Sequence, residues 1–141
     1  MSVTMTREER EAFLAGVHVG VLSVASEGGG ALAVPVWYSY QPGGPVNVIT
    51  GAGTRKAAAV RAAGRFSLCA QDERPPYKYV TVEGPVTIEE AGHDERLALA
   101  RRYLGPEGGD AYVSANPTAG QVVFRMTPER WLTVDYSKVY G

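Results

Sequence analysis

The chain has 141 residues, of which 45% are apolar and 21% are charged, a balance that excludes wholesale disorder. Fourteen basic and fifteen acidic side chains give a net charge of −1, which argues against a nucleic-acid-binding protein because such proteins normally carry a basic excess. The length predicts a single domain over residues 1–141, with a core that needs neither disulfides nor a structural metal.

The first third of the chain predicts a helix followed by a three-stranded meander. Thr6 and Glu9 have the spacing of a capping box, so a helix is expected over Thr6–Ala15. Pro35 lies inside the second strand and indicates a sheet edge or a bulge. Alternating apolar residues between glycine and proline turns predict the three strands, over Val17–Ala25, Ala31–Tyr40 and Val46–Thr50.

The rest of the chain predicts two more helices and four more strands. Thr54 is expected to cap a helix over Arg55–Ala63 that ends at Gly64. An amphipathic helix is expected over Ala91–Leu104, and the Gly- and Pro-rich segment Gly105–Asn116 is expected to be irregular. The fold class is therefore mainly β with short helices, an antiparallel barrel of about seven strands. The remaining strands are predicted over Arg65–Gln71, Tyr77–Ile88, Gln121–Met126 and Glu129–Tyr136.

Three further features concern location, disulfides and metals. No stretch approaches the roughly 18 apolar residues of a membrane span, so no membrane association is expected. Charged residues at positions 7–11 leave no signal-peptide core, and a cytoplasmic protein is expected. Cys69 is the single cysteine, and no His or Cys cluster has metal-ligand spacing, so neither an intrachain disulfide nor a metal site is expected.

The most informative stretch is Thr50–Lys56, where a predicted strand passes through glycines into a helix. A helix N-terminus presents free N–H groups and a partial positive charge, and both favour a phosphate. Arg55 and Lys56 have the wrong sign for this helix end unless an anion lies nearby, and the hydroxyls of Thr50 and Thr54 would add donors. The Walker spacing is absent, and the pattern alone leaves a phosphate site and an ordinary cap with two solvated cations equally open.

Two aromatic clusters, Trp37–Tyr40 and Tyr77–Tyr79, suit either core packing or the stacking walls of a site for a flat heteroaromatic ligand. Residues for acid–base or nucleophilic catalysis are scarce, since His18 and His93 lie 75 positions apart and no GxSxG motif occurs. The catalytic residues are therefore unknown, and an enzyme built on this chain would rely on a cofactor for its chemistry.

An opening helix is followed by five segments in a specific order: the strand at 17–24, Pro35–Tyr38, Thr50–Ala57, Arg65–Leu68 and Tyr79–Gly84. This order resembles the pyridoxamine 5′-phosphate oxidase-like, FMN-binding split-barrel superfamily. The resemblance covers about residues 6–136, and within the superfamily the chain looks most like the small oxidoreductases that use the deazaflavin coenzyme F420. The chain lacks the paired Arg/Lys pattern of true pyridoxamine phosphate oxidases, which argues against vitamin B6 chemistry.

The resemblance implies an antiparallel split β-barrel that forms a homodimer, with two cofactor sites at the interface. It implies that basic residues at the start of the second helix hold the cofactor phosphate, and that an aromatic strand end lines its ring. Further residues would close the pocket, from the same chain or from the partner chain. The implied residues are Thr50, Gly51, Thr54, Arg55 and Lys56 for the phosphate, Pro35, Val36 and Trp37 for the ring, and Tyr77, Lys78, Tyr79 and Trp131 for closure.

Coenzyme F420 is the expected cofactor and FMN is the alternative, because both carry a phosphate and a tricyclic ring. The expected activity is hydride transfer between the deazaflavin and a small unsaturated or conjugated acceptor. Two other functions stay open. One is an FMN-binding oxidoreductase or flavin reductase of the same fold, and the other is a non-enzymatic protein that binds flavin, F420 or haem.

Overall fold

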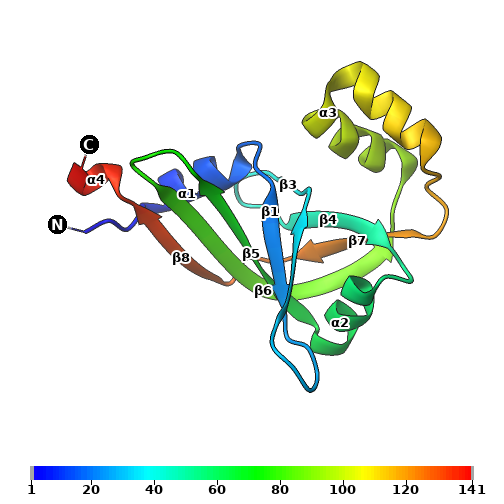
Figure 1. Cartoon of the computed structure of the whole chain (residues 1–141), viewed down its shortest axis with the longest axis horizontal. Coiled ribbons are helices and arrows are strands. Elements are labelled where there is room, and N and C mark those ends of the chain that lie inside the picture. The colour runs from blue at the N-terminus through cyan, green and yellow to red at the C-terminus, as the bar shows by residue number, and fades with distance from the viewer. Residues whose placement is uncertain (1, 141) are drawn as a thin grey trace.

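The computed structural model describes residues 2–140 and shows a strongly curled antiparallel sheet with helices around it (Figure 1). Hydrogen-bonded strands follow the order β2-β1-β5-β6-β7-β4-β3, and β8 pairs with β6. The predicted mainly β, antiparallel split-barrel fold is thereby confirmed. The strands are β1 Gly20–Val24, β2 Leu32–Val36, β3 Ser39–Tyr40, β4 Val46–Gly51, β5 Arg65–Asp72, β6 Lys78–Glu90, β7 Gln121–Met126 and β8 Arg130–Asp135; the helices are α1 Arg7–Ala15, α2 Arg55–Ala63, α3 His93–Ala115 and α4 Ser137–Tyr140.

The long strand β6 joins the two parts of the sheet. Its first half pairs with β5 and β8, and its second half pairs with β7. Between the halves stands Gly84, where a Cβ atom would lie 1.7 Å from the backbone oxygen of Thr127. Only glycine therefore lets the connection between β7 and β8 cross β6 here, and this connection is held by a 2.9 Å bond from the Thr127 N–H to the Pro85 carbonyl.

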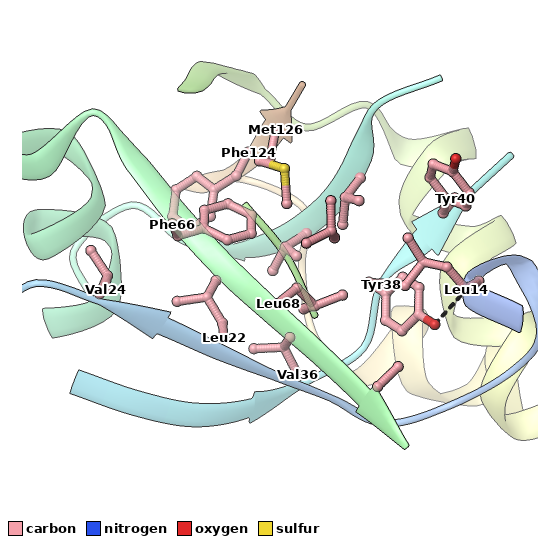
Figure 2. Close-up of a cluster of buried hydrophobic side chains, with 14 of the residues drawn as sticks. Leu14, Leu22, Val24, Val36, Tyr38, Tyr40, Phe66, Leu68, Phe124 and Met126 are labelled. Atoms are coloured by element: carbon pink, nitrogen blue, oxygen red, sulfur yellow. Dashed lines mark hydrogen bonds between the residues drawn. The ribbon is translucent and has the colours of Figure 1, made fainter. Parts of the chain in front are cut away.

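The core is a cluster of buried side chains from several strands of the sheet, and Leu14 of α1 joins it at one end (Figure 2). Leu14 of α1, Leu68 of β5 and Phe124 of β7 are fully buried. The Tyr38 hydroxyl donates a 2.7 Å hydrogen bond to the Leu14 carbonyl, so the one polar atom of this buried side chain is satisfied. Burial raises the pKa of Tyr38.

The predicted strand over Ala31–Tyr40 is wrong in one respect, because it is two strands, β2 and β3, separated at Trp37 and Tyr38. The Tyr38 N–H leaves the sheet ladder and donates to the Tyr103 hydroxyl at 3.0 Å, while the Tyr38 side chain reaches α1. A tertiary hydrogen bond from a distant helix therefore interrupts the strand, and strand propensity gave no sign of it.

The expectation of an irregular segment over Gly105–Asn116 is also wrong, because α3 continues through Ala115. Gly105 has a φ of 80° and breaks α3 into two helical segments, and Pro106 begins the second one, where its missing N–H costs nothing. The segments pack closely, since a Cβ atom on Gly109 would lie 2.6 Å from the backbone nitrogen of Arg101. Low helix propensity is outweighed by packing that glycine alone permits. None of the helices in residues 2–140 is long and apolar enough to cross a membrane.

Candidate functional site

The turn from β4 into α2 places free donors at a helix start. The Thr54 hydroxyl oxygen accepts a 3.2 Å bond from the Ala57 N–H, and the same hydroxyl donates to the Gly51 carbonyl at 2.9 Å. The predicted cap is therefore confirmed. Within residues 2–140, the N–H groups of Arg55 and Lys56 have no acceptor, so two donors remain at the positive end of the helix.

Two basic side chains accompany these donors. Arg55 is exposed and Lys56 is half-buried, and neither has a salt-bridge partner among residues 2–140. Desolvation lowers the pKa of Lys56. Thr50 is buried at the end of β4, and Gly51 continues from it into the turn. Free N–H groups and uncompensated cations together suit an oxyanion such as phosphate.

Beside this helix start lies a hollow of about 420 Å³, here named the Trp37 hollow. Four of the predicted site residues lie together in this hollow: Pro35 and Val36 of β2, Trp37 of the β2–β3 connection and Lys56 of α2. The remaining walls come from β4, from the chain just before β1, and from both segments of α3. The lining residues are Val19, Pro35, Val36, Trp37, Ile49, Lys56, Leu99 and Tyr112.

Helix α3 fixes the aromatic wall of the Trp37 hollow. The Trp37 ring stacks on Tyr103 at 5.1 Å between centroids and 6° between planes, and it contacts Tyr112 at 5.2 Å. The Tyr103 hydroxyl donates to the His18 carbonyl at 2.6 Å, which ties α3 to the chain before β1. Sequence reasoning missed Leu99 and Tyr112 as wall residues, because their place depends on how α3 folds back on itself.

Helix α3 is anchored at two further points. Arg125 of β7 forms a bidentate ion pair with Glu95 at 2.9 and 3.0 Å, which raises the pKa of Arg125. Arg102 donates to the Ala15 and Gly16 carbonyls at 3.0 and 2.8 Å. The helix therefore holds the aromatic wall in one position over the Trp37 hollow.

The other predicted closure residues lie elsewhere in the chain. Tyr77 lines a separate hollow of about 600 Å³ together with Pro75, Pro76, Tyr136 and Tyr140. Lys78 and Tyr79 follow it on β6 and stand opposite Asp135 and Val134 of β8. These residues do not line the Trp37 hollow of their own chain.

Trp131 lies in a third hollow, of about 560 Å³, which is here named the Trp131 hollow. The Arg10 guanidinium carbon lies 4.5 Å from the centre of the indole ring, and Tyr40 meets that ring edge-on at 6.3 Å. Its lining includes Arg7, Arg10 and Glu11 of α1 with Tyr40, Arg125, Glu129 and Trp131.

The histidines are not placed for catalysis in the Trp37 hollow. The His18 Nε2 atom lies 3.0 Å from the Phe13 carbonyl, and its ring stacks on Phe13 at 4.4 Å, so its role is local packing. His93 is exposed at the start of α3. Within residues 2–140, no three His, Cys, Asp or Glu side chains come together as metal ligands.

One row of residues across the sheet, here named the apolar row, carries exposed apolar side chains. The register places Pro35, Val21, Cys69, Thr81 and Leu132 side by side across β2, β1, β5, β6 and β8. Val21 is 38% exposed and Leu132 is 60% exposed, although both are large apolar residues on strands. Cys69 and the polar Thr81 between them are half-buried, and exposed apolar side chains at both ends of such a row are typical of an interaction surface.

Fold and site together define an antiparallel split barrel with an aromatic hollow at a helix N-terminus. The family profile described as pyridoxamine 5′-phosphate oxidase matches residues 6–135, and the chain belongs to this family. A search of curated protein sequences found no match.

Solved structures show the same fold at low sequence identity. A conserved hypothetical protein from Mycobacterium tuberculosis is 21% identical with a TM-score of 0.80, over 99% of this chain and 91% of that one. A protein described as an F420 reductase is 21% identical with a TM-score of 0.73, over 86% of this chain and 94% of that one. A FAD-binding protein from Mesorhizobium loti is 21% identical with a TM-score of 0.66, over 92% of both chains.

Proposed function

We propose that the protein is an F420-dependent oxidoreductase that transfers hydride between the deazaflavin and a small unsaturated or conjugated acceptor. The observation that carries the proposal is the meeting of the Trp37 hollow with the start of α2 at Lys56. A flat ring and a phosphate on one molecule require an aromatic wall and an anion site side by side. The F420 reductase with the same fold supports this choice of cofactor.

The residues present fit such a cofactor. Arg55, Lys56 and the free N–H groups of α2 would hold its phosphate, with Thr54 keeping the turn in place. Pro35 and Trp37 would lie against its ring. When bound and reduced, the cofactor supplies the hydride. The chain's own contribution would be to orient the ring against Trp37 and to shield it from water.

We further propose that residues 1–141 form one domain and that two copies pair through the apolar row. The exposed Val21 and Leu132 side chains support this pairing, because a second copy would cover them. Tyr77, Lys78 and Tyr79 stand apart from the Trp37 hollow of their own chain, so in this proposal they would close the hollow of the partner.

FMN is the second candidate cofactor, and the FAD-binding protein of the same fold favours it. FMN shares the phosphate and the ring, so the same residues would serve both cofactors. A protein that binds F420, flavin or haem without catalysis is the third candidate. It is favoured by the lining of the Trp37 hollow, in which, among residues 2–140, Lys56 and Tyr112 are the ionisable side chains and form no acid–base pair.

The test is a titration of the purified protein with F420 and with FMN, followed by cofactor fluorescence. F420 is expected to bind below about 10 μM and at least about tenfold more tightly than FMN. Tighter binding of FMN would transfer the protein to the flavin-dependent class. Failure of both to bind below about 100 μM would overturn the proposal. Binding of F420 with no hydride transfer to a panel of conjugated acceptors would favour the non-enzymatic candidate.

A further inference from the structure

Arg96 in the first segment of α3 is a buried cation without a counter-ion. Only 5% of its surface is exposed. Its Nη1 group donates to the Asn116 carbonyl and stands 3.5 Å from the Thr118 hydroxyl, and its guanidinium carbon lies 5.6 Å from the centre of the Tyr112 ring. These partners are neutral, and within residues 2–140 no carboxylate forms an ion pair with Arg96. A charge buried in this way is costly unless an anion compensates it.

The other buried or half-buried arginines of α3 and its surroundings differ from Arg96. Arg125 has two carboxylate partners, Glu95 and Glu89. Arg102 also donates to carbonyl groups alone, but these lie at the end of α1 and Arg102 does not line the Trp37 hollow. Arg96 alone among the three combines near-complete burial, the lack of a carboxylate and a position on a cavity wall.

That cavity is a lobe of about 40 Å³, here named the Arg96 lobe. Its walls include Trp37, Ile49, Leu99 and Tyr112, which are also walls of the Trp37 hollow, so the lobe adjoins the hollow. Gln121, at the start of β7, adds a side-chain amide to the lobe. The volume exceeds that of one water molecule and is comparable to that of a carboxylate group.

We propose that the Arg96 lobe receives the carboxylate of the acceptor, so that the protein acts on small conjugated carboxylates. The proposal rests on the proposed function of the Trp37 hollow. The phosphate of the cofactor already has Arg55, Lys56 and the free N–H groups of α2, whereas Arg96 belongs to a different element, α3. A guanidinium can pair with both oxygens of a planar carboxylate, the small lobe suits a group of that size, and the aromatic walls suit a conjugated body.

The test compares trans-cinnamate with trans-cinnamamide, a neutral analogue of the same shape, by calorimetric titration of the cofactor-loaded protein. Wild type is expected to bind cinnamate at least about tenfold more tightly than cinnamamide, because a charge-assisted bond to a buried guanidinium is lost with the amide. Arg96→Met is expected to abolish this preference and Arg96→Lys to retain part of it. Arg7→Met is the control, since it removes an exposed cation of α1 that is paired with Glu11 and lines neither the Trp37 hollow nor the Arg96 lobe, and it is expected to keep the preference.

Equal affinities of the wild-type protein for cinnamate and cinnamamide, or no binding of either, would by themselves overturn the proposal. Retention of the preference in Arg96→Met would overturn it as well. Weaker cofactor binding in Arg96→Met, with the preference kept, would assign Arg96 to the cofactor instead. Should wild type bind neither F420 nor FMN, the proposed function fails, and the same pair of titrations on the cofactor-free protein still decides whether Arg96 selects a carboxylate.

Discussion

The Trp37 hollow and the Trp131 hollow each contain an indole ring and a basic side chain. The two hollows differ in the contacts that the basic side chain makes. In the Trp131 hollow the Arg10 guanidinium lies 4.5 Å from the ring centre, and the neighbouring Arg7 and Arg125 are paired with glutamates. In the Trp37 hollow Lys56 has neither an aromatic nor a carboxylate partner within residues 2–140. A cation that packs on an aromatic ring contributes to the fold, although the buried Nε of Arg10 has no hydrogen-bond acceptor within residues 2–140, whereas a cation without such a ring contact is available to a ligand.

The largest expected effect is the loss of folding stability when Trp131 is substituted. Trp131→Ala removes a ring that packs against the core and carries the Arg10 guanidinium, so the free energy of unfolding is expected to fall by about 3 kcal/mol. Urea denaturation followed by circular dichroism measures this loss. Trp131→Phe keeps an aromatic face and is expected to lose less than half as much.

The same variant tests the prediction that Trp131 binds the cofactor. Because Trp131 faces Arg10 and Tyr40 in its own hollow, we expect the cofactor affinity of folded Trp131→Ala to stay within about twofold of wild type. A large loss of affinity would instead assign Trp131 to the cofactor site, through the partner chain. The Trp131 hollow would then also be a ligand site, like the Trp37 hollow.

The second effect concerns affinity at the Trp37 hollow. Lys56→Ala removes a phosphate contact, and the affinity for the cofactor is expected to fall by about 2 kcal/mol, or about thirtyfold. Stability should not fall, because the partly desolvated Lys56 has no partner to lose. Fluorescence titration measures the affinity, and Arg74→Ala is the control because Arg74 is exposed and paired with Asp72. An unchanged affinity in Lys56→Ala would remove Lys56 from the phosphate site.

A smaller effect is expected from pH. Desolvation lowers the pKa of Lys56 below its usual 10.5, so the free protein loses this charge at a lower pH than an exposed lysine would. The phosphate binds the protonated form, and the cofactor affinity is therefore expected to decline at a pH below the usual lysine pKa of 10.5. Titrations at a series of pH values below 10.5 measure the decline. Lys56→Arg keeps its charge throughout, and a decline of equal size in that variant would show that another group is responsible.

Sequence patterns predicted the parts of the site that local chemistry decides. The Thr54 cap, the glycine turn before it and the Arg55–Lys56 pair all lie within seven residues, and the structure confirms the turn and the cap. The predicted strand Arg65–Gln71 is likewise β5, where Phe66 and Leu68 are buried and alternate with the half-buried Ser67. In both cases, the residues that determine the conformation are neighbours in the chain.

The missed parts depend on contacts between distant residues. Tyr112 reaches the Trp37 hollow only because Gly105 breaks α3 and Gly109 lets its segments pack closely, and glycines in a sequence normally indicate a loop. Arg96 is a buried cation because the second segment of α3 and the Asn116–Thr118 turn cover it, and on an amphipathic helix it would be assigned to solvent. Packing therefore converted ordinary surface residues into walls of the site.

The smallest expected effect returns to α1, which carries Arg10 to the Trp131 ring. Glu9 accepts 2.7 Å bonds from the Lys138 ammonium and from the Thr6 N–H, and these lower its pKa to about 2, the Lys138 bond first. A carboxyl whose pKa is lower in the folded state stabilises the fold above its unfolded pKa, and this contribution is lost as the pH falls from about 4.5 towards 2. Glu9→Gln is expected to lower the melting temperature slightly at pH 7, with a difference from wild type that shrinks over that acid range. Glu8→Gln in the same helical turn is the control, and a difference for Glu9→Gln that stays constant from pH 7 to 2 would show that the Glu9 charge does not support α1.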